Sequence, residues 1–349
     1  MINYNDDALC FDDILLVPQH GDVSSRHSVD TTMSIGSGER EITLSLPVIA
    51  APMDTVCDVE MCIALSNAGG MGILHRYMSY EDQVFKAEML AKSDINFGVA
   101  IASNNGFIEQ AERLYKAGTR LLLVDTANGH GEYAVEAVKK LRFNFPDIHI
   151  MAGNVATMGG FARIASAGAD SIRVGIGGGS ACTTRIVSGH GIPTLASIME
   201  CDNWREAYAG TGINQCSIVA DGGIRNSGDM IKAFAAGADA VMVGSMFAGT
   251  DESPGEILMD GDGRTVKAFR GMASAEAQKD ATGNVSVAEG VSTTVPYKGS
   301  VKHILDDIRG GLGSGCSYSG VHTLNKLSAF AKYVKVSPSS LGESKPHAL

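Results

Sequence analysis

Eight short apolar runs recur along the 349-residue chain, and no other feature constrains its fold as strongly. Most of them start 23 to 28 residues apart, and the intervals carry helix-like stretches such as GFIEQAERLYKAG and SGDMIKAFAAGAD. Near-continuous apolar strands are typical of parallel sheets that are buried on both faces. Eight strand–helix units therefore predict an α/β fold, a (β/α)8 TIM barrel, in preference to a six-stranded doubly wound sheet. The runs are LPVIAAPMD from 46, GMGILHR from 70, FGVAIAS from 97, RLLLVDTANG from 120, IHIMAGNVA from 148, SIRVGIGGG from 171, CSIVADGG from 216 and AVMVGSMF from 240.

Two intervals break this rhythm, and both follow strands at the barrel end where such folds carry their chemistry. The interval that begins with the sixth run is 45 residues long and holds GGGSACTTRIVSGHG, which predicts an extended loop at about 175–195. The second, at about 250–299 after the eighth run, is poor in apolar periodicity and predicts a mobile flap. We therefore look for functional residues in these two segments.

Charge and cysteine content exclude several classes of function. The chain has 28 Lys and Arg against 39 Asp and Glu and contains no basic run, so binding to nucleic acid is not expected. No apolar run approaches the roughly 18 residues of a membrane span, and the amino terminus has no signal-peptide pattern, which favours a cytoplasmic protein with a small-molecule partner. The seven cysteines include no CxxC pair, and the nine histidines show no HxxxH spacing, so we expect reduced thiols and no zinc site.

Cys182 stands out among the cysteines by its position. It follows the sixth run in GIGGGSACTTR, where glycines allow backbone conformations and close approaches that other residues resist. A thiol displayed at the carboxyl end of a barrel strand is a candidate nucleophile. The alternative, a buried packing cysteine, is our interpretation of the other six, because free cysteine is among the most buried residue types.

The seventh and eighth strands end in glycine-containing turns, ADGG at 220–223 and VGS at 243–245. These two strand ends form the usual phosphate position of a barrel. Glycine amides and Ser245 can donate hydrogen bonds to a phosphate, and the carboxylate of Asp221 can accept them from ribose hydroxyls. Ordinary turn chemistry is the alternative for each pair alone, but their coincidence at adjacent strand ends favours a phosphorylated ligand. Asp125, in DTANGHG, is either a structural turn residue or a contact to a second ligand.

An ordered set of motifs runs through nearly the whole chain: FDDILLVP at 11, APMDTV at 51, DTANGHG, MAGNVAT, GIGGGSACTTR, ADGGIRNSGDMIKAFAAGADAVMVGSMFAG, FRGMAS and GGLGSGCSYSG at 310. Through these motifs the chain resembles the IMP dehydrogenase and GMP reductase family. The resemblance implies a TIM barrel, usually a homotetramer, that binds a purine nucleotide and a nicotinamide cofactor. It also implies a cysteine thiolate that attacks the purine at C2.

The family carries out two reactions through the same covalent thioimidate. The dehydrogenase oxidises IMP with NAD and hydrolyses the thioimidate to XMP, using an Arg–Tyr pair on a long flap to activate water. The reductase releases ammonia from GMP and takes hydride from NADPH to give IMP. Between Arg270 and Tyr297 this chain has neither arginine nor tyrosine, and the segment is short, like the reductase flap. Asn128, Cys316 and the expected lack of an inserted CBS domain point the same way.

We therefore predict a GMP reductase-like enzyme that forms a single TIM-barrel domain over 1–349. The alternatives are an IMP dehydrogenase in which Lys279 is the only basic candidate inside the flap, and a non-catalytic sensor of purine nucleotides. NADPH is the expected cofactor, with NADH or NAD possible. The flap arginine of the reductases is missing, so selectivity for NADPH should be weak and should depend on Arg26, Arg76 or Lys279.

The resemblance implies a role for each site residue. Cys182 is the nucleophile, and Thr184 and Glu289 relay a proton to the departing ammonia. The predicted substrate contacts are Ser180, Asp221, Gly222, Gly223, Gly244, Ser245, Gly271, Met272 and Gly290. The predicted cofactor contacts are Asp125, Thr126, Ala127, Arg26 and Arg76. A potassium ion is expected on the carbonyls of Gly177, Gly179 and Cys182, with Arg185 nearby, because oxygen ligands suit such a hard cation.

Overall fold

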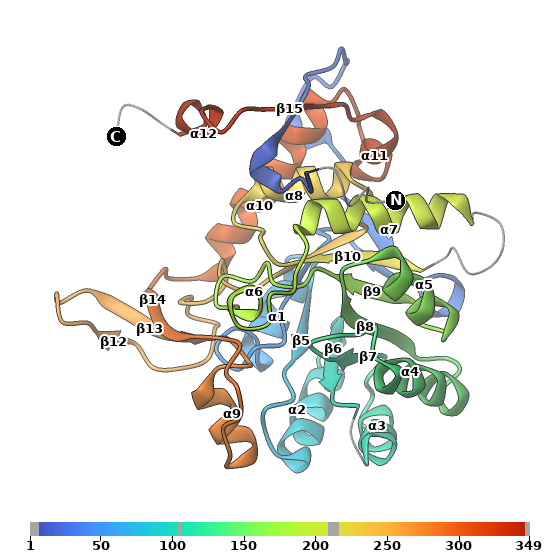
Figure 1. The fold of residues 1–349 in the computed structure, drawn as a ribbon, viewed down its shortest axis with the longest axis vertical. Helices are drawn as coiled ribbons and strands as arrows, with labels where there is room; N and C mark the ends of the chain where they lie inside the picture. Colours follow the sequence, from blue (N-terminus) through green and yellow to red (C-terminus); the bar gives the residue numbers. More distant parts are fainter. Residues whose placement is uncertain (1–6, 104–105, 209–215, 346–349) are drawn as a thin grey trace.

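The computed structural model describes residues 7–103, 106–208 and 216–345. Its centre is a closed barrel of eight parallel strands, and each of the eight apolar runs forms one strand in chain order. The strands are β4 (Val48–Ala50), β5 (Met71–Leu74), β6 (Phe97–Ile101), β7 (Leu121–Asp125), β8 (His149–Val155), β9 (Ser171–Val174), β10 (Ser217–Asp221) and β11 (Ala240–Val243). β11 pairs with β4 and closes the barrel, so the predicted TIM barrel is confirmed (Figure 1).

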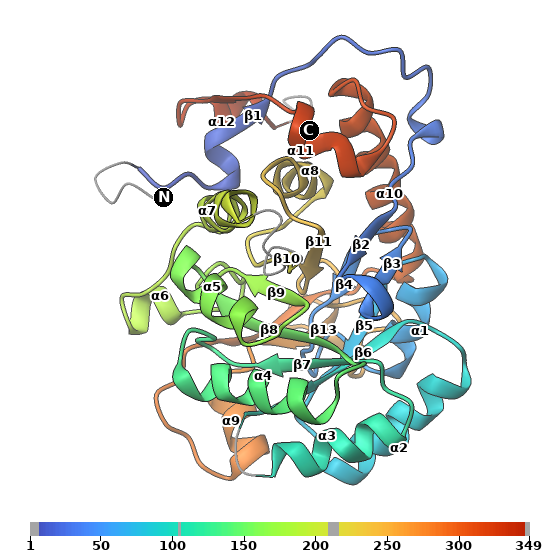
Figure 2. The same ribbon diagram turned by 90° about the vertical axis from the view of Figure 1, so that its right-hand side faces the viewer.

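Helices surround the barrel, as Figures 1 and 2 show. The main ones are α1 (Val59–Asn67), α2 (Tyr80–Lys92), α3 (Phe107–Lys116), α4 (Glu132–Asn144), α5 (Met158–Ser166), α7 (Thr194–Ala207), α8 (Ser227–Ala235) and α10 (Val301–Tyr318). Several begin at residues whose side chains cap the first turn: Thr157 accepts from the Gly160 amide in α5, and Asn226 accepts from the Asp229 amide in α8. The helical stretches expected from the sequence are thus present.

Two apolar layers hold the barrel together. The inner layer fills the barrel with side chains such as Ile49, Leu123 and Met242, all buried. The outer layer lies between the strands and the surrounding helices. A short hairpin of β2 (Met33–Ile35) and β3 (Ile42–Leu44) contributes buried residues to the inner layer. Hydrophobic burial therefore supports the strands from both sides, as the sequence predicts.

Short elements complete the described chain. They are the 3-10 helices η1 (Phe11–Asp13), η2 (Arg26–Ser28), η3 (Gly38–Arg40) and η5 (Leu324–Lys326), the helices α11 (Leu327–Phe330) and α12 (Ser340–Glu343), and the strands β1 (Ile14–Leu16) and β15 (Tyr333–Lys335). β1 pairs antiparallel with β15, so segments near the two ends of the chain lie side by side.

The two irregular intervals follow β9 and β11 and leave the barrel at the carboxyl ends of its strands. The loop after β9 carries the short helix α6 (Thr184–Val187) before α7 begins. The flap contains β12 (Leu258–Met259), β13 (Thr265–Arg270), α9 (Ala275–Thr282) and β14 (Ser292–Pro296). Its three strands form an antiparallel sheet that projects from the barrel at the left of Figure 1. The sequence did not reveal this sheet, because β12 and β14 are mostly exposed and lack an apolar pattern.

Candidate active site

The carboxyl ends of the barrel strands open into a cleft of about 430 Å³. The extended loop at about 175–195, called the catalytic loop from here on, and the flap at about 250–299 supply the rest of its lining. Most of the site residues predicted from the sequence line this cleft: Arg76, Asp125, Thr126, Ala127, Gly177, Gly179, Ser180, Cys182, Thr184, Asp221, Gly222, Gly223, Gly244, Ser245, Gly271, Met272 and Glu289. The fold thus brings together residues that are more than 200 positions apart in the chain.

Cys182, Thr184 and Glu289 form a continuous hydrogen-bond chain. The Cys182 thiol donates to the Thr184 hydroxyl across 3.3 Å, and that hydroxyl donates to Glu289 Oε2 across 2.8 Å. The thiol and the hydroxyl come from the loop after β9, whereas the carboxylate comes from the flap. This order of donors and acceptors suits the transfer of a proton from sulfur to carboxylate.

Backbone pairing holds the flap against the catalytic loop. The Thr183 amide donates to the Glu289 carbonyl, and the Val291 amide donates to the Ala181 carbonyl, both across 3.0 Å. Glycine is required where the two segments meet: a Cβ on Gly271 would lie 2.8 Å from the Ala181 carbonyl oxygen, and Gly290 is similarly crowded. Gly290 does not line the cleft but forms a β-bridge with Cys182. It therefore acts here as a close-packing residue.

Two turns at adjacent strand ends form the candidate phosphate site. They are 222–223 after β10 and 244–245 after β11. None of these four backbone amides donates a hydrogen bond to another residue that the structure describes. Gly222 and Gly223 have φ values of +92° and +77°, a region that favours glycine. The turns can therefore offer several amide donors to one anion.

A chain of buried charges crosses the cleft. Arg173, on β9, donates to Asp221 Oδ2 across 2.7 Å and to Asp125 Oδ1 across 2.6 Å. Arg76 Nε donates to the other oxygen of Asp125 across 3.0 Å. Asn154 adds a 2.8 Å hydrogen bond to Asp221 Oδ2, which leaves Oδ1 of that carboxylate without a donor among the described residues. One oxygen of Asp221 thus stays open for the predicted ribose contact.

Electrostatics fixes the protonation of two cleft residues. Burial alone would raise the pKa of Asp125, but the guanidinium groups of Arg173 and Arg76 outweigh it and hold that pKa below its usual value. Burial raises the pKa of Tyr77 to about 12. Asp125 is therefore ionised at neutral pH, while Tyr77 keeps its proton and cannot act as a base.

Arg26 and Lys279 lie outside the cleft lining, whereas Arg185 lies beside Gly177, as expected. Arg26, expected at the cofactor, lies on η2 against α10, outside the cleft lining, so the fold does not bring it to the site. Lys279, the candidate base of the alternative reaction, is exposed on α9 and does not line the cleft either. Arg185 donates to the Ile192 carbonyl across 3.1 Å and braces the catalytic loop.

Sequence reasoning missed four residues of the cleft and its rim. Arg173 was concealed inside an apolar run, although a single arginine in a buried strand requires carboxylate partners. Asn154 lies in the MAGNVAT motif, which by itself assigns it no role, and Tyr77 lies in no motif. Arg270, at the root of the flap, donates from Nε to Asp54 Oδ2 across 3.0 Å and from Nη1 to Asp280 Oδ2 across 2.7 Å. Only long-range contacts reveal these pairings.

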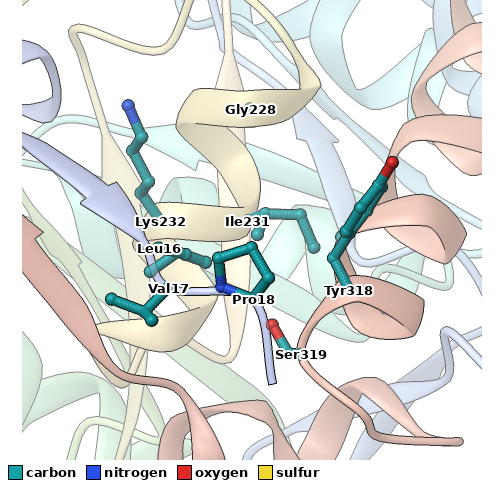
Figure 3. A pocket seen from close by; sticks show the side chains of 9 residues that line it. Leu16, Val17, Pro18, Gly228, Ile231, Lys232, Tyr318 and Ser319 are labelled. Atoms are coloured by element: carbon teal, nitrogen blue, oxygen red, sulfur yellow. The ribbon is translucent and has the colours of Figure 1, made fainter. Parts of the chain in front are cut away.

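A smaller hollow of about 170 Å³ lies outside the barrel (Figure 3). It is lined mainly by apolar side chains of the segment after β1, of α8 and of α10, such as Val17, Ile231 and Tyr318. Its only cation, Lys232, is bonded to the Phe11 carbonyl across 2.8 Å. Within the part of the chain that the structure describes, no His, Cys, Asp or Glu cluster could hold a metal ion, and no helix has the length and hydrophobicity to cross a bilayer.

Comparison with known proteins agrees with the geometry. Residues 8–347 match the family model described as "IMP dehydrogenase / GMP reductase domain". The chain belongs to the IMP dehydrogenase/GMP reductase family. It is thus an oxidoreductase that acts on purine nucleotides, as the sequence motifs predict.

Relatives in this family carry both activities. GMP reductase 2 of Bos taurus is 39% identical over 340 residues, covering 95% of each chain. The inosine-5′-monophosphate dehydrogenase of Borreliella burgdorferi is 37% identical over 405 aligned positions, covering 98% of this chain and 97% of the relative. A crystal structure of a cysteine-to-alanine variant of Trypanosoma brucei GMP reductase in complex with guanosine 5′-monophosphate is 27% identical, with a TM-score of 0.91 and coverage of 99% and 98%.

The potassium ion implied by the family resemblance can be tested against the donors of the catalytic loop. The carbonyl oxygens of Gly177 and Cys182 accept no hydrogen bond from the described residues, and that of Gly179 accepts one from the Cys182 amide across 3.1 Å. Free carbonyl oxygens on one glycine-rich loop suit a hard monovalent cation. The Arg185 guanidinium is itself a cation and cannot be a ligand. The donor set therefore fits the ion through backbone oxygens alone.

Proposed function

We propose that this protein is a GMP reductase: it converts GMP and NADPH to IMP, ammonia and NADP. The observation that carries the proposal is the Cys182–Thr184–Glu289 chain, which supplies one proton route and no second base. Of the other titratable side chains in the described cleft lining, Arg76, Arg173, Asp125 and Asp221 are ion-paired and Tyr77 is protonated. Nothing among them is placed to activate water.

The first step makes the thiolate and uses the hydrogen-bond chain. The Cys182 proton passes through the Thr184 hydroxyl to Glu289, and the thiolate then attacks C2 of the purine. The exocyclic amino group of GMP cannot leave as an amide anion, so Glu289 returns the proton through Thr184 and ammonia departs. The product of this step is a thioimidate on Cys182.

The second step reduces the thioimidate. When bound, a reduced nicotinamide cofactor would supply hydride to C2; the carbon–sulfur bond would then break, releasing IMP and restoring the Cys182 thiolate. Asp125, Thr126, Ala127 and Arg76, at the ends of β5 and β7, would hold this cofactor. The two turns at 222–223 and 244–245, with Ser180, would hold the 5′-phosphate, and Asp221 the ribose. Met272 and Gly271 would face the base. A potassium ion on the carbonyls of Gly177, Gly179 and Cys182 would keep the loop in shape.

Length adds support to the reductase assignment. The alignment with the Borreliella dehydrogenase contains 405 positions, 56 more than the 349 residues of this chain, whereas the bovine reductase aligns over 340. We accordingly propose a single barrel domain without a CBS insertion. The resemblance also supports a homotetramer in the cytoplasm.

An IMP dehydrogenase is the alternative, because relatives with that activity are about as similar. It would need a base that activates water, and the exposed position of Lys279 on α9 speaks against the one basic candidate between Arg270 and Tyr297. We expect GMP with NADPH to give IMP and ammonia, and IMP with NAD to give XMP slowly or not at all.

Product analysis by chromatography, with each substrate pair at saturating concentration, tests the proposal. Cys182→Ala serves as the control, since it should remove both reactions. XMP formed from IMP and NAD faster than IMP from GMP would overturn the assignment. No turnover with either pair, together with intact GMP binding, would instead favour a nucleotide sensor.

A further inference from the structure

The turn that follows β11 is bonded to the flap on the side away from the barrel. Its residues 244–250 carry the second of the two candidate phosphate turns. The Lys298 amide donates to the Gly249 carbonyl across 2.8 Å, and the Tyr297 hydroxyl donates to Asp251 Oδ1 across 2.6 Å. Because Tyr297 and Lys298 directly follow β14, these hydrogen bonds join the flap sheet to the segment that follows β11.

The Lys298 ammonium donates hydrogen bonds to the turn at and beside Ser245, a residue of the candidate phosphate site. It donates to the Ser245 carbonyl across 2.8 Å and to the Met246 carbonyl across 3.1 Å. The Ser245 carbonyl and the Met246 N–H belong to one peptide unit, and in a trans peptide these two groups point in opposite directions. Because the Ser245 carbonyl points towards Lys298, the Met246 N–H points away from the lysine. That amide donates to no other described residue. The lysine thus fixes the orientation of a free donor next to the cleft.

Lys298 also lacks a counter-charge. No carboxylate lies within ion-pair distance of it among the described residues. The two guanidinium groups of the cleft, in contrast, are neutralised by Asp125 and Asp221. Lys298 thus brings an uncompensated cation from the flap into contact with the turn at 244–246, where a dianionic phosphate is expected. Such a charge attracts the anion without touching it.

We propose that Lys298 is a positioning residue for the nucleotide 5′-phosphate, which it serves by orienting the 244–246 turn and by facing it with an unpaired positive charge. The inference rests on the proposed function in so far as the ligand is a purine 5′-monophosphate. Under this proposal the flap contributes a residue to the phosphate site, because Lys298 lies in the segment after β14 and not on a barrel strand.

Lys267 offers a matched control. It lies on β13 of the same flap sheet, and its ammonium also donates to two backbone carbonyls, those of Thr250 across 3.0 Å and Ser253 across 2.6 Å. These carbonyls lie farther along the chain from the turn at 244–245, and Lys267 is almost fully buried, with acidic neighbours Asp251 and Glu252. Its loss should weaken folding and leave phosphate recognition unchanged.

The test compares binding of GMP with binding of guanosine by isothermal titration calorimetry. In Lys298→Met we expect the dissociation constant of GMP to rise about tenfold to a hundredfold, because the phosphate loses the attraction of an unpaired positive charge, while that of guanosine changes less than about twofold. Lys298→Gln keeps a donor without charge, so its loss should be smaller and its GMP affinity less sensitive to salt than that of the parent. Lys267→Met should lower Tm and keep the ratio of the two affinities.

Several results would overturn the inference. They are GMP affinity within about twofold of the parent in Lys298→Met, equal weakening of GMP and guanosine, or the same phosphate-specific loss in Lys267→Met. If Lys298→Met does not fold, an unchanged GMP affinity and salt dependence in Lys298→Gln refutes it instead. A parent protein that binds neither GMP nor IMP would refute the proposed function itself, which the titration of the parent detects before any variant is compared.

Discussion

Replacing Thr184 by valine should interrupt the proton relay with little change in shape. Among the described residues, the hydroxyl is what links the Cys182 thiol, 3.3 Å away, to Glu289, 2.8 Å away. Without it the two groups are too far apart for direct proton transfer, which needs a separation of roughly 2.6 to 3.2 Å. A positioned proton carrier contributes about a hundredfold to ten-thousandfold, so kcat should fall by that factor, roughly 3 to 5 kcal/mol in the barrier.

The assay follows oxidation of NADPH at 340 nm with GMP as substrate and measures the GMP dissociation constant separately. Thr184→Ser keeps the hydroxyl and should retain most of kcat, whereas Glu289→Gln should lower kcat as Thr184→Val does, because it removes the terminal carboxylate. KM should change little in all three, since these groups add little contact area. A Thr184→Val enzyme with parental kcat, or with a raised KM alone, would refute the relay and make Thr184 a binding residue.

Three further predictions follow from the same geometry. Cys182→Ala should abolish turnover, because the covalent bond to the purine can no longer form. Its GMP affinity, measured by calorimetry, should stay within a few-fold of the parent, because the proposed phosphate contacts at the two turns remain. The ratio of kcat/KM for NADPH to that for NADH should stay below about a hundred, since Arg76 is already paired with Asp125; a larger ratio would reveal a dedicated 2′-phosphate site. Burial lowers the pKa of His149, so the unfolded chain takes up a proton below about pH 6.5 while the folded chain does not. Stability should thus be full above that pH and fall below it, by up to about 1.4 kcal/mol per pH unit, and urea unfolding at pH 7.5 and 5.5 should show a smaller difference for His149→Gln.

The barrel and the catalytic loop could be predicted from the sequence, because both depend on local patterns of residues. Each strand is a short apolar run whose spacing leaves room for one helix, and burial on both faces makes that pattern visible. Cys182 and the turns at 222–223 and 244–245 could be found because glycines mark unusual backbone at strand ends. The family motifs then supplied Thr184 and Glu289.

The remaining features depend on contacts between distant segments. Arg173 lies within an apolar run, and nothing local shows that its partners are Asp125, 48 residues before it, and Asp221, 48 residues after it. The flap sheet is mostly exposed, so its strands carry no burial pattern. Arg26 was placed at the cofactor for its charge alone, yet η2 packs against α10 outside the cleft.

The ion pairs of Arg173 give a physical reason for the proposed role of the flap in nucleotide binding. Withdrawing two carboxylates from water at the carboxyl ends of β7 and β10 is costly, and Arg173 offsets this cost for both Asp125 and Asp221. The positive charge of Arg173 is therefore neutralised by these carboxylates and is not available to a phosphate. In the proposed site the phosphate would then depend on backbone amides of the two turns and on Lys298, a cation that the flap supplies. The same flap carries Glu289, which accepts the hydrogen bond of Thr184. Under the proposed mechanism one segment would therefore serve both phosphate binding and proton transfer, and a change in its position should alter both together.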